Sequence, residues 1–362
     1  MEPRGGGQQP HRDPRPLTAR AAPTVPTADD DFRPARWLRN RHVQSMLSST
    51  SWRRVRVLRG AAALIAAQRE LLLECGADVR LQCFVSSPPH SSGVAPVVLL
   101  HGWEGSADSL YVLSIAQQLF GLGVEVARLN LRDHGETHHL NRELFHSCRL
   151  PEVIGAVQAL QAHFPGRPLS AVGFSLGGNF LLRVAARARE ASLDLARVIA
   201  ISPVLEPTET LVALETAMPG YQGFFVRKWR RSLRKKEAAW PGSYDFAQLR
   251  GGLREMTDEL VRRHSDYATL EDYLNGYSIT AERLASLAVP AHILTSLDDP
   301  MIPAGGLARL ARPAALTVTV TRYGGHCGFI ESLAGLTWAE RLVLRLSAEK
   351  AGDLSGRPFC DR

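Results

Sequence analysis

The 362-residue chain is short of cysteine and of long apolar segments, and each shortage excludes a class of protein. Its five cysteines are an odd number with no Cys-x-x-Cys pair, which argues against a disulfide framework and is typical of a reducing compartment. The apolar stretch at residues 60–67 is too short to cross a bilayer. We therefore expect a cytoplasmic protein without a membrane-spanning helix.

Cofactor signatures are missing as well. The glycine-rich segments lack the Lys-Ser or Lys-Thr ending of a phosphate loop and the spacing of a dinucleotide fingerprint, so nucleotide use is not expected. His134 and His138 lie four residues apart, but Gly135 and Thr137 between them disfavour a helix, and the His-Glu-x-x-His pattern is absent. The sequence predicts a protein without a metal or other cofactor.

The N-terminal end differs in composition from the rest of the chain. Residues 1–30 contain several Pro, Gly, Arg and Gln and no apolar core of a signal peptide, so we expect a disordered leader. The chain as a whole is 45% hydrophobic and 22% charged, which is typical of a globular protein. Residues 31–362 are therefore predicted to form one folded domain.

Beyond the leader, the chain alternates between strand-like and helix-like patterns. Helical patterns such as 106–120 and 151–164 separate the predicted strands. A β-rich start followed by this alternation predicts an α/β fold, with a mainly parallel, doubly wound sheet covered by helices on both faces. The predicted strands are residues 69–74 and 79–85 as an antiparallel hairpin, then 97–100, 124–130, 169–174, 197–202, 291–296 and 316–323.

One pentapeptide, Gly173-Phe174-Ser175-Leu176-Gly177, lies between a predicted strand and a predicted helix. This order of strand, Gly-x-Ser-x-Gly turn and helix is typical of a nucleophile elbow. The tight turn leaves no room for side chains at the two glycines, and it projects the serine Oγ above the sheet. Ser175 is therefore the predicted nucleophile, and a plain strand-to-helix turn is the alternative.

A nucleophilic serine needs a general base, an acid that orients the base, and an oxyanion hole. For an elbow of this kind, the expected chain order is Ser, then Asp or Glu, then His. The Asp298–Asp299 pair follows one predicted strand, and His326 lies in a glycine-flanked loop just after the last one. All three groups follow strand ends, where open α/β sheets place their sites.

The segment His101-Gly102-Trp103-Glu104-Gly105-Ser106 supplies a candidate oxyanion hole. One donor is expected from the amide after the nucleophile, that of Leu176, and the second from this segment, the amide of Trp103. His101 is expected to brace the loop rather than to act as a second base. An ordinary glycine-rich turn is the alternative.

Taken together, these segments resemble one known family. The resemblance runs from about Phe32 to about Ala348 and keeps its order throughout. It implies the α/β-hydrolase fold and a carboxylester hydrolase without a metal, which acts on short or medium acyl chains. The segments His101–Ser106, Gly173–Asn179, Asp298–Pro300 and Gly324–Ile330 resemble the YheT-like group of α/β-hydrolases, and Phe32-Arg33-Pro34, Trp37-Leu38 and His42-Val43-Gln44-Ser45 resemble that group's N-terminal signature.

The resemblance also suggests roles. Carried over by motif, Ser175 is the nucleophile, His326 the base and one aspartate of the pair the acid. Asp299 is preferred to Asp298 because Pro303 follows it by four residues, the usual spacing in this superfamily. The chain departs from the group's Asn-Phe-Arg-Gly-Cys-Ser-Gly-Glu pattern at residues 130–136, which read Asn-Leu-Arg-Asp-His-Gly-Glu, and we expect this difference to affect substrate preference.

These residues predict a serine esterase that forms an acyl-enzyme with a small-molecule or lipid ester. An acyltransferase or a thioesterase would use the same Ser175, Asp299 and His326, so the sequence leaves that choice open. A non-catalytic binding protein on the same fold is the alternative from a different class.

The alternation of strands and helices stops at about residues 203–280, which predicts a helical cap insertion. The chain has a net charge of +7, and its basic residues are dense only at residues 227–236 of this insertion. This run favours a solvated helix face, with peripheral contact to an anionic membrane as the alternative. No nucleic-acid motif accompanies the run, so no nucleic-acid partner is expected. Phe225, Trp229 and Leu233 share one helix face, which either packs the cap onto the main domain or lines an acyl pocket.

Overall fold

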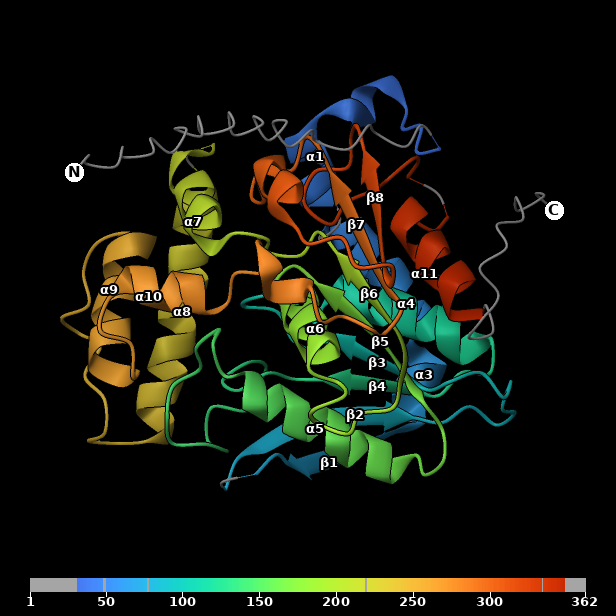
Figure 1. The fold of residues 1–362 in the computed structure, drawn as a ribbon, viewed down its shortest axis with the longest axis horizontal. Helices are drawn as coiled ribbons and strands as arrows, with labels where there is room; N and C mark the ends of the chain where they lie inside the picture. Colours follow the sequence, from blue (N-terminus) through green and yellow to red (C-terminus); the bar gives the residue numbers. More distant parts are fainter. Residues whose placement is uncertain (1–30, 48–49, 77, 219, 334, 349–362) are drawn as a thin grey trace, which may run out of the picture.

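The computed structural model describes residues 31–47, 50–76, 78–218, 220–333 and 335–348 (Figure 1). The leader predicted for residues 1–30 lies outside these ranges. A central sheet is covered by helices on both faces, and a group of helices stands beside one end of the sheet (Figure 1). The predicted α/β architecture with a mainly parallel sheet is confirmed.

Eight strands form one sheet in the order β1-β2-β4-β3-β5-β6-β7-β8. β1 and β2 form the predicted antiparallel hairpin, β2 is also antiparallel to β4, and the remaining neighbours are parallel. β3 and β5 are buried along their whole length, as expected for parallel strands covered on both faces. The bounds are β1 (Gln68–Glu74), β2 (Arg80–Ser86), β3 (Val97–Leu100), β4 (Val126–Leu129), β5 (Leu169–Phe174), β6 (Leu195–Ile201), β7 (Ala291–Ser296) and β8 (Leu316–Thr321).

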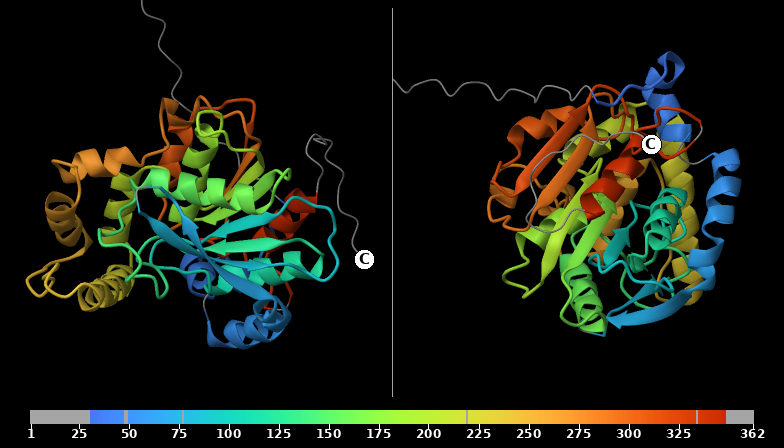
Figure 2. Two further views of the ribbon diagram at one scale, coloured as in Figure 1. Left: turned by 90° about the horizontal axis from the view of Figure 1, so that it is seen from below. Right: turned by 90° about the vertical axis from the view of Figure 1, so that its right-hand side faces the viewer.

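Helices cover the two faces of the sheet separately (Figures 1 and 2). α4 (Leu110–Gly121) and α11 (Trp338–Ala348) pack on one face, whereas α5 (Leu150–His163) and α6 (Leu176–Ala186) pack on the other. Alternate residues of β3 join two different apolar clusters, because successive side chains of a strand point to opposite faces. Among the described residues, no helix combines the length and apolar character needed to cross a membrane.

The N-terminal part is helical, which corrects the prediction of a β-rich start. The 3₁₀ helix η1 (Arg36–Arg39) and the helices α1 (Arg41–Leu47), α2 (Ser51–Gly60) and α3 (Ala62–Ala66) precede β1. Val57, Ala61 and Leu64 are buried at the i, i+4, i+7 spacing of a helix face, and they join the apolar cluster of α4. The short apolar run at residues 60–67 belongs largely to this helical pair.

In the region between β6 and β7 where the sequence predicts a cap, the described residues form four α-helices, which the short 3₁₀ helix η2 (Glu282–Leu284) follows. The α-helices are α7 (Pro207–Thr216), α8 (Gly220–Ala239), α9 (Leu253–His264) and α10 (Leu270–Gly276), and we call residues 207–276 the helical insertion. Leu233 of α8 packs with Met256 and Leu260 of α9 in a small apolar core of the insertion. α9 begins only after Gly251, whose φ of 83° breaks the helical path before it.

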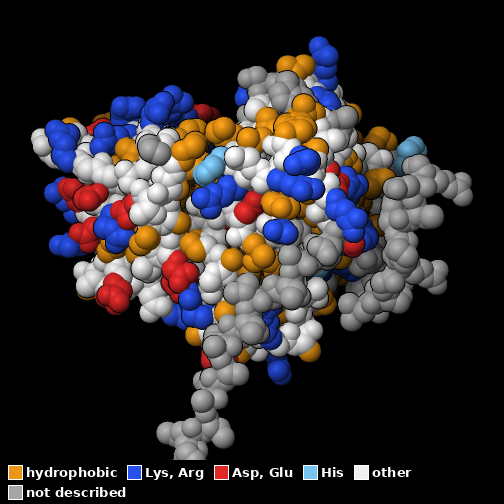
Figure 3. All heavy atoms as spheres, turned by 90° about the horizontal axis from the view of Figure 1, so that it is seen from above, with side chains coloured by type: hydrophobic (Ala, Val, Ile, Leu, Met, Phe, Trp, Pro, Cys, Tyr) orange, Lys and Arg blue, Asp and Glu red, His pale blue; other side chains and the backbone are white. Residues whose placement is uncertain are grey.

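Charge on the outer surface is mixed. On the face shown in Figure 3, hydrophobic side chains gather near the centre, while Lys and Arg are spread over the face together with Asp and Glu. The positive net charge of +7 therefore does not form one continuous basic surface on this face.

Candidate active site

Ser175 lies at the turn between β5 and α6 with φ 50° and ψ −119°. A positive φ is rare for a residue with a side chain and indicates a backbone held under strain by its surroundings. Both flanking glycines are needed: a Cβ at Gly173 would lie 2.5 Å from the Gly177 carbonyl oxygen, and a Cβ at Gly177 would lie 2.3 Å from the His101 carbonyl oxygen. The pentapeptide thus forms the strand–turn–helix arrangement expected of an elbow.

Asp299 contacts His326 from the loop after β7. Its Oδ2 lies 2.9 Å from His326 Nδ1, and its side chain is completely buried. Its Oδ1 accepts hydrogen bonds from the backbone N–H groups of Met301 at 2.8 Å and Ile302 at 3.0 Å. These two bonds orient the carboxylate toward the imidazole.

Asp298 points elsewhere. Its Oδ1 accepts a hydrogen bond of 2.9 Å from the Gly325 N–H, which ties the loop after β7 to the loop after β8. Its Oδ2 is buried without a hydrogen-bond partner, and burial raises the pKa of this carboxyl group. Of the two adjacent aspartates, the structure brings only Asp299 to His326.

The charge state of His326 is set by two opposing effects. Burial lowers the pKa of its imidazole, but the carboxylate of Asp299 and contacts with Cys327 outweigh burial and raise the pKa well above 6.5. The surroundings therefore stabilise the protonated imidazole, and a general base must be able to accept a proton.

The end of β6 connects the Ser175 turn to the His326 loop. The carbonyl oxygen of Ile201 accepts a hydrogen bond of 2.9 Å from the Ser175 N–H and also contacts Cys327 Sγ at 3.7 Å. The Cys327 N–H donates to Ser202 Oγ at 3.2 Å. No hydrogen bond joins Ser175 to His326 among the described side chains, and such bonds often become short only when substrate binds.

Strained residues mark this whole edge of the sheet. Each of the loops that follow β3, β4, β5, β6 and β8 contains a non-glycine residue with positive φ. Strain of this kind clusters at functional sites, because it persists only where the surrounding structure enforces it. The residues are Glu104 (56°), Asp133 (58°), Ser175 (50°), Ser202 (45°) and, both in the loop after β8, Cys327 (57°) and Phe329 (46°).

The candidate oxyanion loop packs directly against the Ser175 turn. A Cβ at Gly102 would lie 3.1 Å from Ser175 Cβ. In the part of the chain that the structure describes, neither the Trp103 N–H nor the Leu176 N–H has an acceptor. Buried His101 braces the loop as predicted: its Nδ1 lies 2.7 Å from the Gly102 carbonyl oxygen, and its Nε2 accepts from the Leu131 N–H at 3.2 Å.

The helical insertion reaches the same edge through the lysines of α8. Lys236 is buried, and its Nζ lies 2.8 Å from Asp133 Oδ1 in the loop where the chain departs from the YheT-like pattern. Lys228 Nζ donates to the Glu104 carbonyl oxygen at 2.6 Å, and Lys235 pairs with Glu136. Sequence reasoning missed these contacts, since a dense run of basic residues indicates a solvated face.

The prediction of a solvated face for residues 227–236 is therefore wrong for Lys228 and Lys236, whereas Lys235 is partly exposed and pairs with an exposed glutamate. It is right for four arginines of the same run on α8. Their spacing of i, i+3, i+4 and i+7 puts them on one side of the helix. The exposed arginines are Arg227, Arg230, Arg231 and Arg234.

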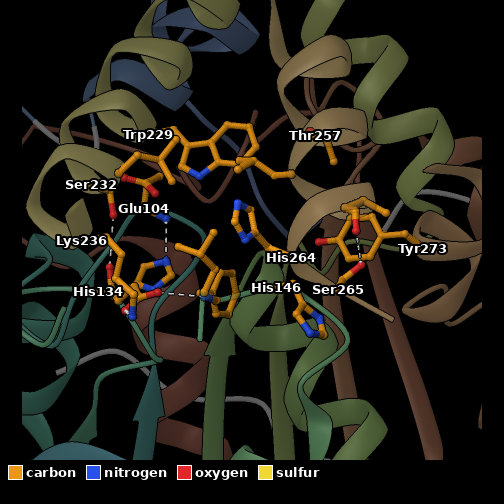
Figure 4. Close-up of a pocket in the computed structure, with 16 residues that line it drawn as sticks. Glu104, His134, His146, Trp229, Ser232, Lys236, Thr257, His264, Ser265 and Tyr273 are labelled. Carbon is orange, nitrogen blue, oxygen red and sulfur yellow. Dashed lines mark hydrogen bonds and ion pairs between the residues drawn. The ribbon is translucent and has the colours of Figure 1, made fainter. Parts of the chain in front are cut away.

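Aromatic contacts join α8 to the candidate oxyanion loop. Trp103 stacks on Phe225 with ring centroids 5.5 Å apart, and Trp229 meets Trp103 edge-on at 5.3 Å. Trp229 and Leu233 also line a cavity of about 50 Å³ beneath the insertion (Figure 4). The predicted stripe of Phe225, Trp229 and Leu233 thus packs the insertion onto the main domain, and part of it also faces a cavity.

Two hollows lie side by side here. The cavity in Figure 4 combines apolar side chains from α8, α9 and residues 144–145 with His134, His146 and His264. A wider polar hollow of about 260 Å³ shares Glu104, Asp133, His134 and Ser232 with it. His134 is hydrogen-bonded to backbone groups, and nowhere in the described ranges do three or more His, Cys, Asp or Glu side chains form a group able to hold a metal ion.

Known proteins resemble this chain over most of its length. A family model described as alpha/beta hydrolase fold matches residues 95–333. The chain is 28% identical over 310 residues to the putative esterase YheT of Escherichia coli (strain K12), covering 83% of this chain and 87% of that protein. Phospholipase ABHD3 of Mus musculus is 23% identical over 250 residues, 66% of this chain and 59% of that protein. A monoacylglycerol lipase ABHD2 of Danio rerio is 21% identical over 300 residues, 76% of this chain and 69% of that protein.

Solved structures support the same fold. The esterase Pf2001 of Pyrococcus furiosus superposes with a TM-score of 0.51 at 13% identity, covering 77% of this chain and 87% of that one. A membrane phospholipase A, described as a bacterial virulence factor, gives a TM-score of 0.50 at 18% identity, covering 84% and 91%. At these identities the likeness shows the fold alone. Because the family model spans more than half of the sequence and YheT resembles most of it, the chain belongs to the α/β-hydrolase fold family as a YheT-like member.

Proposed function

We propose that this chain is a serine hydrolase that cleaves carboxylic esters, with Ser175 as nucleophile, His326 as general base and Asp299 as the acid. The observation that carries the proposal is the 2.9 Å contact between Asp299 Oδ2 and His326 Nδ1, at the same sheet edge as the strained Ser175. The relatives named as an esterase, a phospholipase and a monoacylglycerol lipase support hydrolysis of an ester bond.

The first half of the reaction acylates the serine. His326 Nε2 takes the Ser175 proton as Oγ attacks the ester carbonyl carbon, and Asp299 stabilises the imidazolium through Nδ1. The backbone amides of Trp103 and Leu176 donate to the oxyanion, a contribution that is often the largest in acyl transfer. The tetrahedral intermediate collapses when His326 protonates the leaving alcohol, which leaves the acyl group on Ser175.

The second half of the reaction releases the carboxylic acid product. His326 deprotonates a water molecule as its oxygen attacks the acyl carbon, and the new intermediate collapses when His326 returns the proton to Ser175 Oγ. An acyltransferase or a thioesterase would use the same residues with a different acceptor or substrate. Besides the ester, hydrolysis needs only the water molecule that resolves the acyl-enzyme.

The substrate that we propose is a small-molecule or lipid ester with a short or medium acyl chain. The 50 Å³ cavity and the adjoining polar hollow of about 260 Å³ are both lined by Glu104 of the candidate oxyanion loop and by neither Ser175 nor His326, so they support an ester that extends from the candidate site toward the helical insertion. Trp229 lines the cavity and packs on the candidate oxyanion loop, so it would limit chain length. Hydrolysis of p-nitrophenyl esters of increasing chain length would define this limit.

A fluorophosphonate probe tests the proposal directly. The wild-type protein should become labelled at Ser175 and should hydrolyse p-nitrophenyl esters, whereas Ser175→Ala should do neither and should keep its melting temperature. Loss of a triad serine lowers kcat by about 10⁶ in a well-studied protease. A Ser175→Ala protein that retains more than a few per cent of the activity would refute the assignment, and a wild type that neither labels nor turns over would favour the non-catalytic alternative.

We also propose a peripheral contact between the exposed arginines of α8 and an anionic membrane surface. Phe224, which is 51% exposed on the same helix, would add an apolar contact. Cosedimentation with phosphatidylglycerol vesicles at low and high salt tests this idea, and no binding at low salt would rule it out. The free thiols of Cys75, Cys83, Cys148 and Cys327 support a reducing compartment such as the cytoplasm.

A further inference from the structure

The loop that carries His326 is held by side chains from the other end of the chain. The His326 N–H donates to Ser45 Oγ at 2.9 Å, and the Ile330 N–H donates to Gln44 Oε1 at 2.8 Å. Gln44 Nε2 in turn donates to the Ile330 carbonyl oxygen at 2.8 Å and to the Leu38 carbonyl oxygen at 2.7 Å. The α1 helix thus supplies hydrogen-bond partners to both ends of residues 326–330.

The backbone of the loop also packs tightly against α1. A Cβ at Gly325 would lie 2.4 Å from the Arg41 carbonyl oxygen, and a Cβ at Gly328 would lie 2.6 Å from the Gln44 carbonyl oxygen. Glycine is therefore required at both positions for the loop to approach α1 this closely. The segment that makes these contacts lies before residue 95, where the match to the hydrolase family model begins.

We infer that Ser45 is a positioning residue for His326, and this inference rests on the proposed role of His326 as the base. Two contacts act on that residue directly: Asp299 holds the ring at Nδ1, and Ser45 holds the backbone N–H. Asp298 and Ser202 bind the N–H groups of the neighbouring residues 325 and 327, so Ser45 supplies the acceptor for the backbone of His326 itself. A misplacement of about 1 Å in a catalytic group costs roughly 10²-fold in rate.

Ser45 also links the base to the helical insertion. Its Oγ donates to the Arg41 carbonyl oxygen at 2.7 Å, which orients the hydroxyl within α1. Burial raises the pKa of Tyr221 in α8 and the Ser45 side chain opposes this rise, and the Tyr221 hydroxyl lies 3.1 Å from His42 Nδ1. The α1 helix therefore contacts both the His326 loop and α8.

The test compares Ser45→Ala with Thr50→Ala in the full-length protein. Thr50 is the matched control, because its hydroxyl belongs to the same segment and donates to the Leu47 carbonyl oxygen at 3.0 Å. Ser45→Ala should lower kcat for a p-nitrophenyl ester on the order of tenfold or more, with KM little changed, because the His326 N–H loses its acceptor. The rate of fluorophosphonate labelling should fall in parallel, and Thr50→Ala should match the wild type in both measurements.

A proton NMR signal gives a readout that does not depend on turnover. The Nδ1–H of His326, bonded to Asp299, should appear far downfield in the wild type and should broaden or shift in Ser45→Ala. Ser45→Thr, which keeps the hydroxyl, should recover most of the lost kcat. If Ser45→Ala fails to fold, Tyr221→Phe, which removes the hydroxyl that contacts α1 at His42 and keeps the ring, should show a smaller loss of kcat and a smaller shift of the same signal.

Two results would overturn the inference. One is an active wild type whose kcat and downfield signal are unchanged in Ser45→Ala. The other is a lower melting temperature in Ser45→Ala with full activity per folded molecule, which would make the contact structural only. Failure of the proposed function gives a different result, because the wild type itself would then neither label nor turn over.

Discussion

The two sides of the candidate site are built in different ways. On the main-domain side, backbone contacts hold the Ser175 turn, in which Gly173 and Gly177 let β5, α6 and the loop after β3 approach closely. On the side of the helical insertion, side chains make the contacts: Lys228 and Lys236 of α8 reach a carbonyl oxygen and a buried carboxylate. The main-domain side therefore fixes the proposed reacting groups, and the insertion side fixes the residues that surround them.

This division has a consequence for mutations. A change to the side chain of Ser175, Asp299 or His326 on the main-domain side should lower the rate of the chemical step and leave stability nearly unchanged. A change on the insertion side should lower stability or alter substrate preference and leave the chemical step nearly unchanged. The three predictions below test this division, from the largest to the smallest expected change in the free energy of activation or of unfolding.

The largest effect is expected at Asp299. Asp299→Asn keeps an oxygen that can accept from the Met301 and Ile302 N–H groups, so the fold should persist, but the imidazole loses the charge that holds its tautomer. We expect kcat to fall by about 10⁴, as when the triad acid of a serine protease is replaced. Steady-state kinetics on a p-nitrophenyl ester, with a melting curve, would measure both effects.

Asp298→Asn is the matched control for Asp299→Asn. Its oxygen can still accept from the Gly325 N–H, so the loss of kcat should stay within about tenfold. The pH profile adds a second readout. Asp299 raises the pKa of His326, and the base works only when unprotonated, so losing the carboxylate should move the acidic limb of the profile to lower pH. The assignment of the acid is wrong if Asp298→Asn is the more damaged variant.

The second effect concerns Lys236. Lys236→Met leaves the buried carboxylate of Asp133 without its cation, and breaking a buried pair in this way costs about 3–5 kcal/mol in the free energy of unfolding. Burial raises the pKa of Asp133 and Lys236 lowers it, so the pKa should rise further in the variant. At acid pH Asp133 then binds a proton and needs no cation, so the variant should lose less stability there. Urea denaturation at pH 7 and pH 5 would measure this.

Lys235→Met provides the control for Lys236→Met. The Lys235 side chain is 39% exposed and pairs with Glu136, which is 83% exposed, so its loss should change stability by less than about 1 kcal/mol. Equal losses in the two variants would contradict the role of the buried pair. A loss of kcat per folded molecule as large as that of Asp299→Asn would break the division between the two sides.

The smallest effect is expected at Trp229. Trp229→Ala enlarges the cavity, so the preferred ester should have a longer acyl chain. Each added methylene group should change the activation free energy by roughly 1–3 kcal/mol, and the rate for the shortest ester should change little. Phe224→Ala is the control, because Phe224 is 51% exposed on the same helix and does not line the cavity. An unchanged chain-length profile in Trp229→Ala would leave this tryptophan with a packing role only.

Local patterns allowed much of the sheet and of its edge to be predicted. The hairpin of β1 and β2, the apolar runs of β3 and β5, and the Ser175 turn each depend on residues that are adjacent in sequence. The position of His326 after the last strand followed from chain order. The choice of Asp299 over Asp298 came from a resemblance, and the structure places Asp299 against the imidazole.

Contacts between distant residues could not be predicted. Lys236 lies in a basic run that indicates solvent, and only the fold shows that Asp133, a hundred positions earlier, accepts its charge. Ser45 and Gln44 belong to a recognised signature, but nothing in their local pattern indicates hydrogen bonds to residues 326 and 330. The helical start was missed because its buried residues follow a helix period within a short stretch that looked merely apolar.

The strained residues at the sheet edge lower the stability of the fold while they place side chains at the candidate site. At five loops a residue with a side chain occupies a backbone conformation that suits glycine, at a cost of roughly 1 kcal/mol each. Together they consume an amount comparable to the net stability of a small domain. Glycine would relieve this strain, but at position 133 it would remove the carboxylate that pairs with buried Lys236, and at position 175 it would remove the hydroxyl group. The strain is therefore retained together with the side chains that these backbone conformations place at the sheet edge.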